Sequence, residues 1–378
     1  MIIGFDCVNI KSGGGVTHIV ELVSSADPTR DHFECLYVWG SKALLDSLPN
    51  YSWIIKQWHP WFDKSIFHRL IWQTFLLRIK ATKLKCNLLF IPSSTIFCFF
   101  RPVVTMHQNL LPFQWSELRR YGLSLTTARL IFLRICQSVA FHLSDGVIFL
   151  SSYSQEVVEK AIGTLLCKKT VIPHGVSKIY PEPIHHSRPN LVSDVSKTQL
   201  LYVSTIDLYK HQWHVVEGVA LARQRLQLDL QLAFIGHPYH PALNKLNCAF
   251  NRFDPYAKWS TYHGPIHHDK LADYYVKSNI FIWASTCETF GIPLLEATLF
   301  NLPIICSNYE PMKSMLGESA LYFDPLRPST LADALELMVG NSALPQILLN
   351  RAKLKLSISS DEVAEKTFAF FRQVLITE

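Results

Sequence analysis

The sequence lacks the features that mark membrane-spanning, metal-binding and secreted proteins. No apolar run is long enough to cross a membrane, because the nearest candidate, residues 88–100, is interrupted at Pro92. The nine cysteines are an odd number without metal-ligand spacing, which favours free thiols in a reducing compartment. No basic leader precedes the first apolar run, so we expect no secretory signal. Together these absences predict a cytoplasmic protein.

Acidic residues are absent from one long segment. Between Asp63 and Glu117 there is none, and basic residues gather in the same segment. They are Lys64, Arg69, Arg78, Lys80, Lys83, Lys85 and Arg101. Residues 1–180 hold 19 Lys and Arg against 11 Asp and Glu, and the remainder of the chain holds 17 against 19. A basic first half predicts an anionic partner, either a lipid phosphate or an anionic membrane surface on the inner face of the plasma membrane.

Apolar side chains recur at helical spacing within this basic segment, for example Phe67, Leu70, Ile71 and Phe75. The spacing predicts one helix over 64–85. Two interpretations of this helix stay open. It is either a membrane-surface helix or a core helix with a solvated basic face.

Short apolar runs alternate with longer amphipathic ones along the chain. This alternation predicts an α/β fold with two doubly wound, Rossmann-like parallel sheets. The expected strands are 2–7, 33–39, 88–91, 103–106, 146–150, 170–173, 200–204, 230–235, 259–263, 280–283, 303–306 and 320–323. Ligands bind beyond the carboxyl ends of such strands, so two facing domains predict a site in the cleft between them.

The domain boundaries follow from composition. Residues 176–197 are rich in Pro, Ser and His and have no periodic pattern, which indicates a linker. We therefore expect domains at 1–180 and 198–358, with 181–197 as the linker proper and a C-terminal helix within 359–378. At 378 residues the chain is long enough for two cores.

One segment carries most of the chemistry. Residues 285–297 hold Glu288 and Glu296 eight residues apart. An apolar run precedes the segment and Pro293 lies within it, so we expect a strand followed by a helix that begins near the proline. Glu288 is then predicted at a strand end and Glu296 in the first helical turn.

Between the two glutamates lie Thr289, Phe290 and Gly291. Their backbone amides are expected to point out of the helix N-terminus, where an anion binds readily, and the glycine allows a phosphate to come close. Carboxylates on both sides of a phosphate cradle suit a sugar nucleotide, because they accept hydroxyl groups while the amides hold the diphosphate.

Five further motifs accompany the paired glutamates. They are Gly13-Gly14-Gly15, Val104–His107, Val171–Gly175, Tyr202–Lys210 and Ala320–Pro325. In this order they resemble the retaining glycosyltransferases of family 4, also called glycosyl transferases group 1, which have the two-domain GT-B fold. The resemblance covers nearly the whole chain. It implies transfer of a hexose from a nucleotide-diphospho-sugar donor to a glycan or polyprenyl-linked acceptor, as in bacterial lipopolysaccharide, O-antigen or capsule assembly. It also implies that the C-terminal helix packs on the first domain.

The resemblance also implies roles for individual residues. Glu296 holds the ribose hydroxyls, and Glu288 holds sugar hydroxyls and orients the anomeric carbon. The amides of residues 289–291, with Lys210 and Thr205, take up charge as the diphosphate leaves. The family commonly has an arginine where this chain has Thr205, so one cationic contact is missing.

In the first half, Gly14 and Gly15 are expected to bring backbone amides close to a donor phosphate. His107 is expected at a strand end near the sugar, as a catalytic residue. Relatives often have an aspartate directly after this histidine, whereas this chain has Gln108.

We expect no metal, no other cofactor and no nucleic-acid partner. No Asp-x-Asp motif is present, and His263, His267 and His268 lack the spacing of a helical ligand pair. Two alternatives to a transferase stay open. One is a GT-B enzyme of other chemistry, such as a sugar-nucleotide epimerase or a phosphorylase, and the other is a non-catalytic scaffold.

Overall fold

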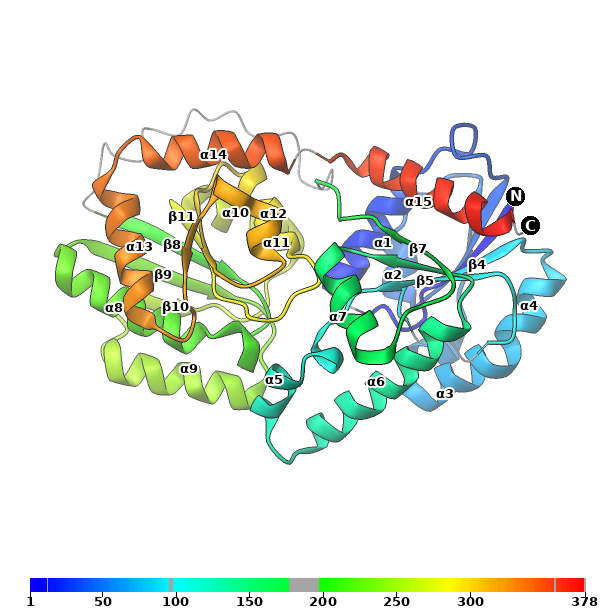
Figure 1. The fold of residues 1–378 in the computed structure, drawn as a ribbon, viewed down its shortest axis with the longest axis horizontal. Helices are drawn as coiled ribbons and strands as arrows, with labels where there is room; N and C mark the ends of the chain where they lie inside the picture. Colours follow the sequence, from blue (N-terminus) through cyan, green and yellow to red (C-terminus); the bar gives the residue numbers. More distant parts are fainter. Residues whose placement is uncertain (12, 95–97, 177–196, 357, 377–378) are drawn as a thin grey trace. The chain divides into compact units, whose positions relative to one another are not determined.

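The computed structural model describes residues 1–11, 13–94, 98–176, 197–356 and 358–376. The chain divides into two compact units (Figure 1). Unit 1 comprises Met1–Leu118, Gly122–Gly175 and Ile358–Glu378, and unit 2 comprises Arg119–Tyr121 and Val176–Ser357. The linker predicted at 181–197 lies, apart from Lys197, outside the described residues.

Unit 1 contains a seven-stranded parallel sheet of order β3-β2-β1-β4-β5-β6-β7. The strands are β1 Ile2–Asp6, β2 Cys35–Trp39, β3 Ile54–Gln57, β4 Leu88–Ile91, β5 Val103–His107, β6 Gly146–Phe149 and β7 Lys168–Val171. Strand β3 was not predicted, because its polar second half, Lys56 and Gln57, hides the apolar pattern at this sheet edge. Strand β7 begins two residues before its predicted start, with exposed lysines that a pattern search passes over.

The helices of unit 1 are α1 Gly14–Ser24, α2 Lys42–Ser47, α3 Ile66–Ile71, α4 Leu77–Lys83, α5 Trp115–Leu118, α6 Leu125–Leu143, α7 Ser152–Ile162 and α15 Ser360–Leu375. Several begin at serine caps, which satisfy backbone amides left without a partner at a helix start. The Ser151 side chain accepts from the Ser154 amide, and Ser359 accepts from Glu362. Helix α15 packs within unit 1, where the Phe368 ring stacks on Phe33 at 4.8 Å.

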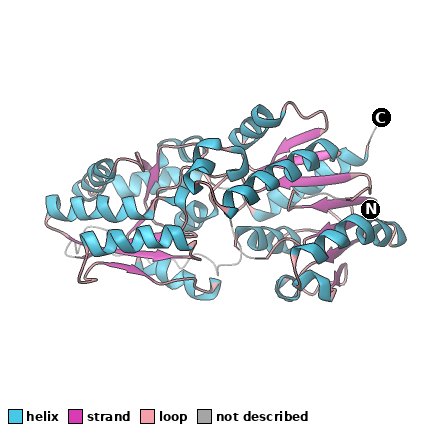
Figure 2. Ribbon diagram, turned by 90° about the horizontal axis from the view of Figure 1, so that it is seen from below, coloured by secondary structure: helices cyan, strands magenta, loops and turns pink. Residues whose placement is uncertain are grey.

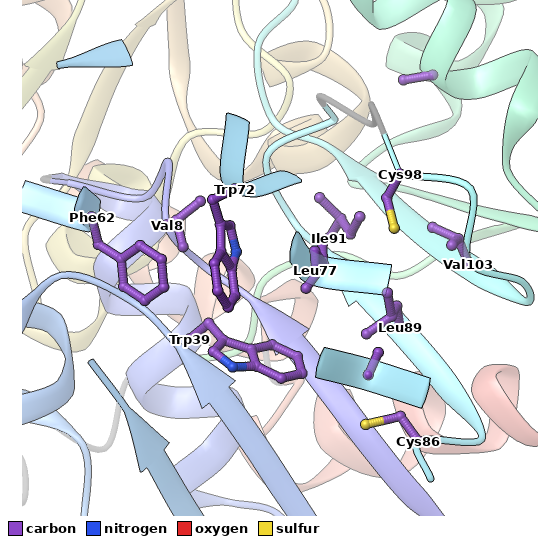
Figure 3. Close-up of a cluster of buried hydrophobic side chains, with 12 residues drawn as sticks. Val8, Trp39, Phe62, Trp72, Leu77, Cys86, Leu89, Ile91, Cys98 and Val103 are labelled. Carbon is purple, nitrogen blue, oxygen red and sulfur yellow. The ribbon is translucent and has the colours of Figure 1, made fainter. Parts of the chain in front are cut away.

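The prediction of one continuous helix over 64–85 is wrong, because the segment is not a single regular α-helix. Helices α3 and α4 are joined by a π-helical turn, Trp72–Leu76. The wider turn lets two consecutive side chains, Trp72 and Gln73, both be buried. Trp72 contacts the Phe62 ring edge-on at 4.8 Å, and Figure 3 shows its indole between Phe62 and Leu77, above Trp39. This cluster fixes the inner side of the segment against the sheet.

Unit 2 contains a six-stranded parallel sheet of order β10-β9-β8-β11-β12-β13. The strands are β8 Lys197–Val203, β9 Asp229–Ile235, β10 Ser260–Tyr262, β11 Ile280–Trp283, β12 Ile304–Ser307 and β13 Leu321–Phe323. The helices are α8 Gln212–Leu226, α9 His240–Phe253, α10 His268–Lys277, α11 Ile292–Leu299, α12 Met312–Leu316, α13 Pro328–Gly340 and α14 Leu344–Lys355.

In each unit helices cover the strands, as Figure 2 shows, so the predicted α/β fold with two Rossmann-like sheets is confirmed. In each sheet the strand order reverses beside the first strand of the unit, at β1/β4 and at β8/β11. Such a switch point is where open parallel sheets bind ligands. None of the helices in the described ranges is long and apolar enough to span a membrane.

Candidate functional site

The segment with the paired glutamates forms a loop and a helix at the switch point of unit 2. Strand β11 ends at Trp283, and α11 begins at Ile292 with Pro293 in its first turn. Gly291 precedes the helix with φ 127° and ψ 67°, a conformation that favours glycine. A Cβ there would also lie 3.1 Å from Leu294 Cδ1. The glycine therefore allows the loop to turn tightly into the helix.

Glu296 was expected in the first turn of this helix, and that expectation is wrong. It is the fifth residue of α11 and points inward, with 6% of its surface exposed. The Tyr275 hydroxyl from α10 donates to Glu296 Oε2 at 2.6 Å. Tyr275 is fully buried and stacks on Phe300 at 5.0 Å, so it fixes the direction of the carboxylate. The helix begins at Ile292 rather than at the proline, which moves Glu296 into the second turn.

Glu288 and Lys210 form an ion pair, Lys210 Nζ to Glu288 Oε1. Only 6% of the Lys210 side chain and 14% of the Glu288 side chain are exposed. The ammonium also lies 4.3 Å from the centre of the Trp283 ring, close enough for a cation–π contact. The pair joins the loop after β8 to the loop after β11, and these two strands are neighbours in the sheet. Two residues predicted separately are thus brought together at the switch point.

Lys210 ends a short 3₁₀ turn, η5 (Leu208–Lys210), and the surrounding residues hold this turn in place. The Tyr202 hydroxyl donates to the Lys210 carbonyl at 2.6 Å and accepts from the Ala284 amide at 3.2 Å. Burial raises the pKa of Tyr202 well above its usual value, so its hydroxyl stays protonated. Tyr202 therefore ties η5 to the end of β11, a role that sequence reasoning missed.

His211 follows Lys210 in the left-handed conformation, with φ 52°. Its Nε2 lies 3.2 Å from Thr286 Oγ1, in the loop that carries Glu288. Burial lowers the pKa of His211 to about 3, so the ring is neutral near pH 7. Thr289 is buried, whereas Thr205 is exposed and its carbonyl accepts from the Gln212 side chain at 2.9 Å. Phe290 is buried as well, at 6% exposed.

In unit 1, Gly14 and Gly15 are the first residues of α1, after strand β1. The N-cap residue of this helix is Gly13, which has no side chain to cap it, and the first turn has no acidic residue. Gly13 precedes it with φ 69°, and an added Cβ there would meet nothing within 4 Å. The glycines thus form the turn from β1 into α1, and their contact with a donor phosphate stays a prediction.

His107, the last residue of β5, is fully buried. Its ring lies among Phe113, Phe141 and Phe149 at 5.6 to 5.8 Å between ring centres, and Nε2 lies 2.9 Å from the Asn109 carbonyl oxygen. Burial lowers its pKa to about 4, so the ring is neutral. In this structure the His107 ring is buried and contacts the loop that follows β5. A contact between His107 and the sugar stays a prediction.

His263, one of the histidines after β10, packs against an aromatic ring. His263 contacts the Tyr274 ring edge-on at 5.0 Å. Within the described part of the chain, no group of three His, Cys, Asp or Glu side chains converges as metal ligands do.

Comparisons with known proteins give a family-model match in the second half of the chain. Residues 184–355 match the family model described as glycosyl transferases group 1. A stretch of 67 residues is 33% identical to the O-antigen chain mannosyltransferase B of Escherichia coli, and it spans 18% of each protein. The chain thus matches less than a fifth of that relative's length.

Two solved structures are similar over nearly their full length. A glycosyltransferase from Rickettsia africae has a TM-score of 0.73 and 14% identity, with 100% of this chain and 99% of that chain covered. HepE of Anabaena, solved in complex with UDP and glucose, has a TM-score of 0.71 and 16% identity, with 99% and 100% covered. The strand orders and these likenesses establish the predicted GT-B fold. Residues 184–355 therefore match the model of glycosyl transferases group 1, within a chain of the GT-B fold.

Proposed function

We propose that this chain is a retaining glycosyltransferase of family 4, which moves a hexose from a nucleotide-diphospho-sugar to a glycan or polyprenyl-linked acceptor. The observation that carries the proposal is the buried pair of Lys210 and Glu288 at the β8/β11 switch point. A cation and a carboxylate lie together where a parallel sheet binds its ligand, which supports the binding of a diphosphate by the first and of sugar hydroxyls by the second. The names of the relatives support it, because one is an O-antigen mannosyltransferase and another was solved with UDP and glucose.

In the proposed reaction the donor diphosphate takes Lys210 away from Glu288. The released carboxylate then accepts hydroxyl groups of the sugar, while the amides of residues 289–291 bind phosphate oxygens. The bond between the anomeric carbon and the phosphate oxygen breaks, and the acceptor hydroxyl attacks from the same face. Its proton passes to the leaving phosphate oxygen. Glu296, oriented by Tyr275, holds the ribose hydroxyls.

We propose further that no metal or other cofactor takes part. The positive charge that a metal would supply to the leaving diphosphate comes from Lys210 and from helix N-termini. Addition of a chelator is then expected to leave turnover unchanged.

We also propose that unit 1 binds an anionic membrane on the cytoplasmic side. Helix α3 and the π-turn after it expose large apolar side chains, of which Phe67 is 71% and Phe75 64% exposed. The same segment, 64–85, carries six Lys and Arg and no acidic residue. An exposed apolar face flanked by basic residues is the pattern of a helix that lies in the membrane interface. The exposure favours the membrane-surface interpretation over a core helix.

The experiment that tests the transferase is a screen of GDP-, UDP- and dTDP-sugars by thermal shift and by slow hydrolysis of the donor. We expect one nucleotide series to raise the melting temperature and its sugar to be released. Interconversion of the sugar without its release would identify an epimerase instead. Binding of no nucleotide would favour the scaffold.

A further inference from the structure

A short turn from the first half of the sequence belongs to unit 2. This turn, η4 (Arg119–Tyr121), is assigned to unit 2, although the residues on both sides of it belong to unit 1. It contacts η5, the turn that ends at Lys210. Tyr121 is buried, and its ring centre lies 5.6 Å from that of Tyr239. The segment is therefore part of the surroundings of Lys210.

Tyr121 is connected to Lys210 through one carboxylate. Its hydroxyl donates to Asp207 Oδ1 at 2.6 Å. The same oxygen accepts from the Leu208 amide at 2.7 Å and so caps η5. Burial and the charge of Asp207 raise the pKa of Tyr121, so the phenol stays protonated and donates. Removal of this hydroxyl would leave a largely buried carboxylate with one hydrogen bond fewer.

Arg120 precedes Tyr121 in the same turn. Its charge contributes to the lowered pKa values of His211 and His214, after burial as the main cause. Arg120 lies in η4, which contacts η5, so its charge lies close to the turn that ends at Lys210. The family's arginine is replaced here by the exposed Thr205. Arginine is well suited to a diphosphate because its planar donors bind phosphate oxygens in pairs.

We propose that the turn η4 completes the diphosphate site of unit 2. Tyr121 and Asp207 are positioning residues that hold the turn carrying Lys210, and Arg120 supplies the positive charge that Thr205 lacks. The inference rests on the proposed function and adds a specific element to it. The diphosphate site would then draw on residues of the first half of the sequence, outside the range of the family match.

The first test is the binding of nucleoside diphosphates by calorimetry, with UDP, GDP and dTDP as probes. Arg120→Ala should weaken the binding of the diphosphate about 10-fold or more, as for loss of a hydrogen bond to a charged group. The corresponding monophosphate should be affected less, and the salt dependence of diphosphate binding should become weaker. Arg119→Ala is the matched control, because it removes an exposed arginine from the same turn.

The second test separates positioning from folding. Tyr121→Phe keeps the ring and removes only the hydroxyl, so turnover should fall several-fold while the melting temperature changes little. Tyr322→Phe is the control, because its hydroxyl also donates a hydrogen bond within unit 2, to the Gly317 carbonyl, and Tyr322 lies in the edge strand β13. If turnover falls equally in Tyr121→Phe and Tyr322→Phe, the Tyr121 hydroxyl contributes only to the stability of the fold and does not position Lys210.

The outcomes are distinct. Tight binding by the wild type with equal binding by Arg120→Ala and Arg119→Ala would overturn the role of Arg120 and leave the proposed function standing. Binding of none of the three diphosphates by the wild type would overturn both.

Discussion

The two sheets share one topology and differ in what they carry at the switch point. In unit 2 the loops after β8 and β11 bring together a charged pair, Lys210 and Glu288. In unit 1 the corresponding first strand ends in Asp6, which is fully buried and accepts a hydrogen bond from Gln73. Burial raises the pKa of Asp6 to about 6, so this carboxyl group takes up a proton at a higher pH than an ordinary aspartate.

The histidines of unit 1 extend this difference. Its buried His18 and His174 face each other, with 3.1 Å between their Nδ1 atoms, and burial lowers the pKa of both. Unit 1 therefore has buried histidines and an exposed apolar face, whereas unit 2 has the ion pair of Lys210 and Glu288. A shared fold thus does not imply a shared chemical role, which depends on the loops at the strand ends.

The largest effect is expected from the charged pair itself. Glu288→Gln should lower turnover, because it should remove about 2–4 kcal/mol of transition-state stabilisation. This is the size of the loss when other preorganised electrostatic contacts are removed. Lys210→Ala should have a similar effect, because charge on the diphosphate grows only as the bond breaks. Steady-state kinetics with the identified donor measure both changes.

The control for this prediction is a second ion pair of unit 2. Arg225 and Asp333 lie 2.6 Å apart on the surface, and both are largely exposed. Arg225→Ala should leave turnover unchanged, since an exposed pair contributes little. Near-normal turnover of Glu288→Gln would place the reaction elsewhere and remove the contrast between the two sheets.

A smaller effect, of a different kind, is expected at Glu296. If it holds the ribose, it binds the ground state and the transition state about equally. Glu296→Gln should then raise the Michaelis constant for the donor by about 10–100-fold, the scale of hydrogen bonds to a charged group, and leave turnover nearly intact. Tyr275→Phe should also raise the Michaelis constant for the donor, but by less, because the loss of its hydroxyl only makes the Glu296 carboxylate less fixed. A fall in turnover without a change in the Michaelis constant would contradict the assignment to ribose.

A third prediction concerns the acid sensitivity of unit 1 and uses His107, whose ring is fully buried. Its ordinary pKa of 6.5 falls to about 4 in the folded chain. The unfolded chain therefore binds a proton between about pH 6.5 and 4 that the native state does not, so stability is lost as the pH falls through this window. At pH 5 the loss from this one residue is about 2 kcal/mol, at about 1.4 kcal/mol per pKa unit.

His107→Gln should remove part of this acid sensitivity, although it also costs stability at pH 7. Denaturant unfolding at pH 7 and pH 5 measures the difference. The three rings around His107 do not titrate in this range, and the exposed His142 provides a control as His142→Gln. Asp6 works in the opposite direction, because its raised pKa makes stability fall as the pH rises through about 6. An equal pH slope in wild type and His107→Gln would refute the prediction.

The sequence predicted the fold and the candidate site to different extents. Strands such as β4 and β11 are continuous apolar runs, and their burial on both faces follows from that. The edge strand β3 and the π-turn were missed, because the first is half polar and the second depends on the packing of Trp72. Apolar patterns in the sequence predict a helix or strand where the local pattern alone determines which residues are buried. They fail where packing against distant parts of the chain determines it.

For the candidate site, motif spacing identified Glu288, Glu296 and Lys210, but not the contact between two of them. The three tyrosines that hold them carry no local signal. Tyr275 follows another tyrosine on α10, and Tyr202 lies within an apolar strand. Tyr121 is 86 residues from its partner Asp207. Contacts over such separations come from the fold, which is why a single sequence did not reveal them.

The smallest effect is expected at the surface of unit 1. The apolar face formed by α3, the π-turn and α4 should bind anionic liposomes weakly, and binding should decline with added salt, since each basic residue near the surface contributes about 1 kcal/mol. Phe67→Ser with Phe75→Ser should reduce sedimentation with the liposomes, because both rings are exposed and apolar. Tyr256→Ser in unit 2 is the control, as Tyr256 is 80% exposed and also lies beside a lysine. Liposomes without anionic lipid should bind poorly. Equal loss of binding in the Tyr256 variant, or no binding at low salt, would mean that unit 1 has no special surface and that a soluble acceptor is the better hypothesis.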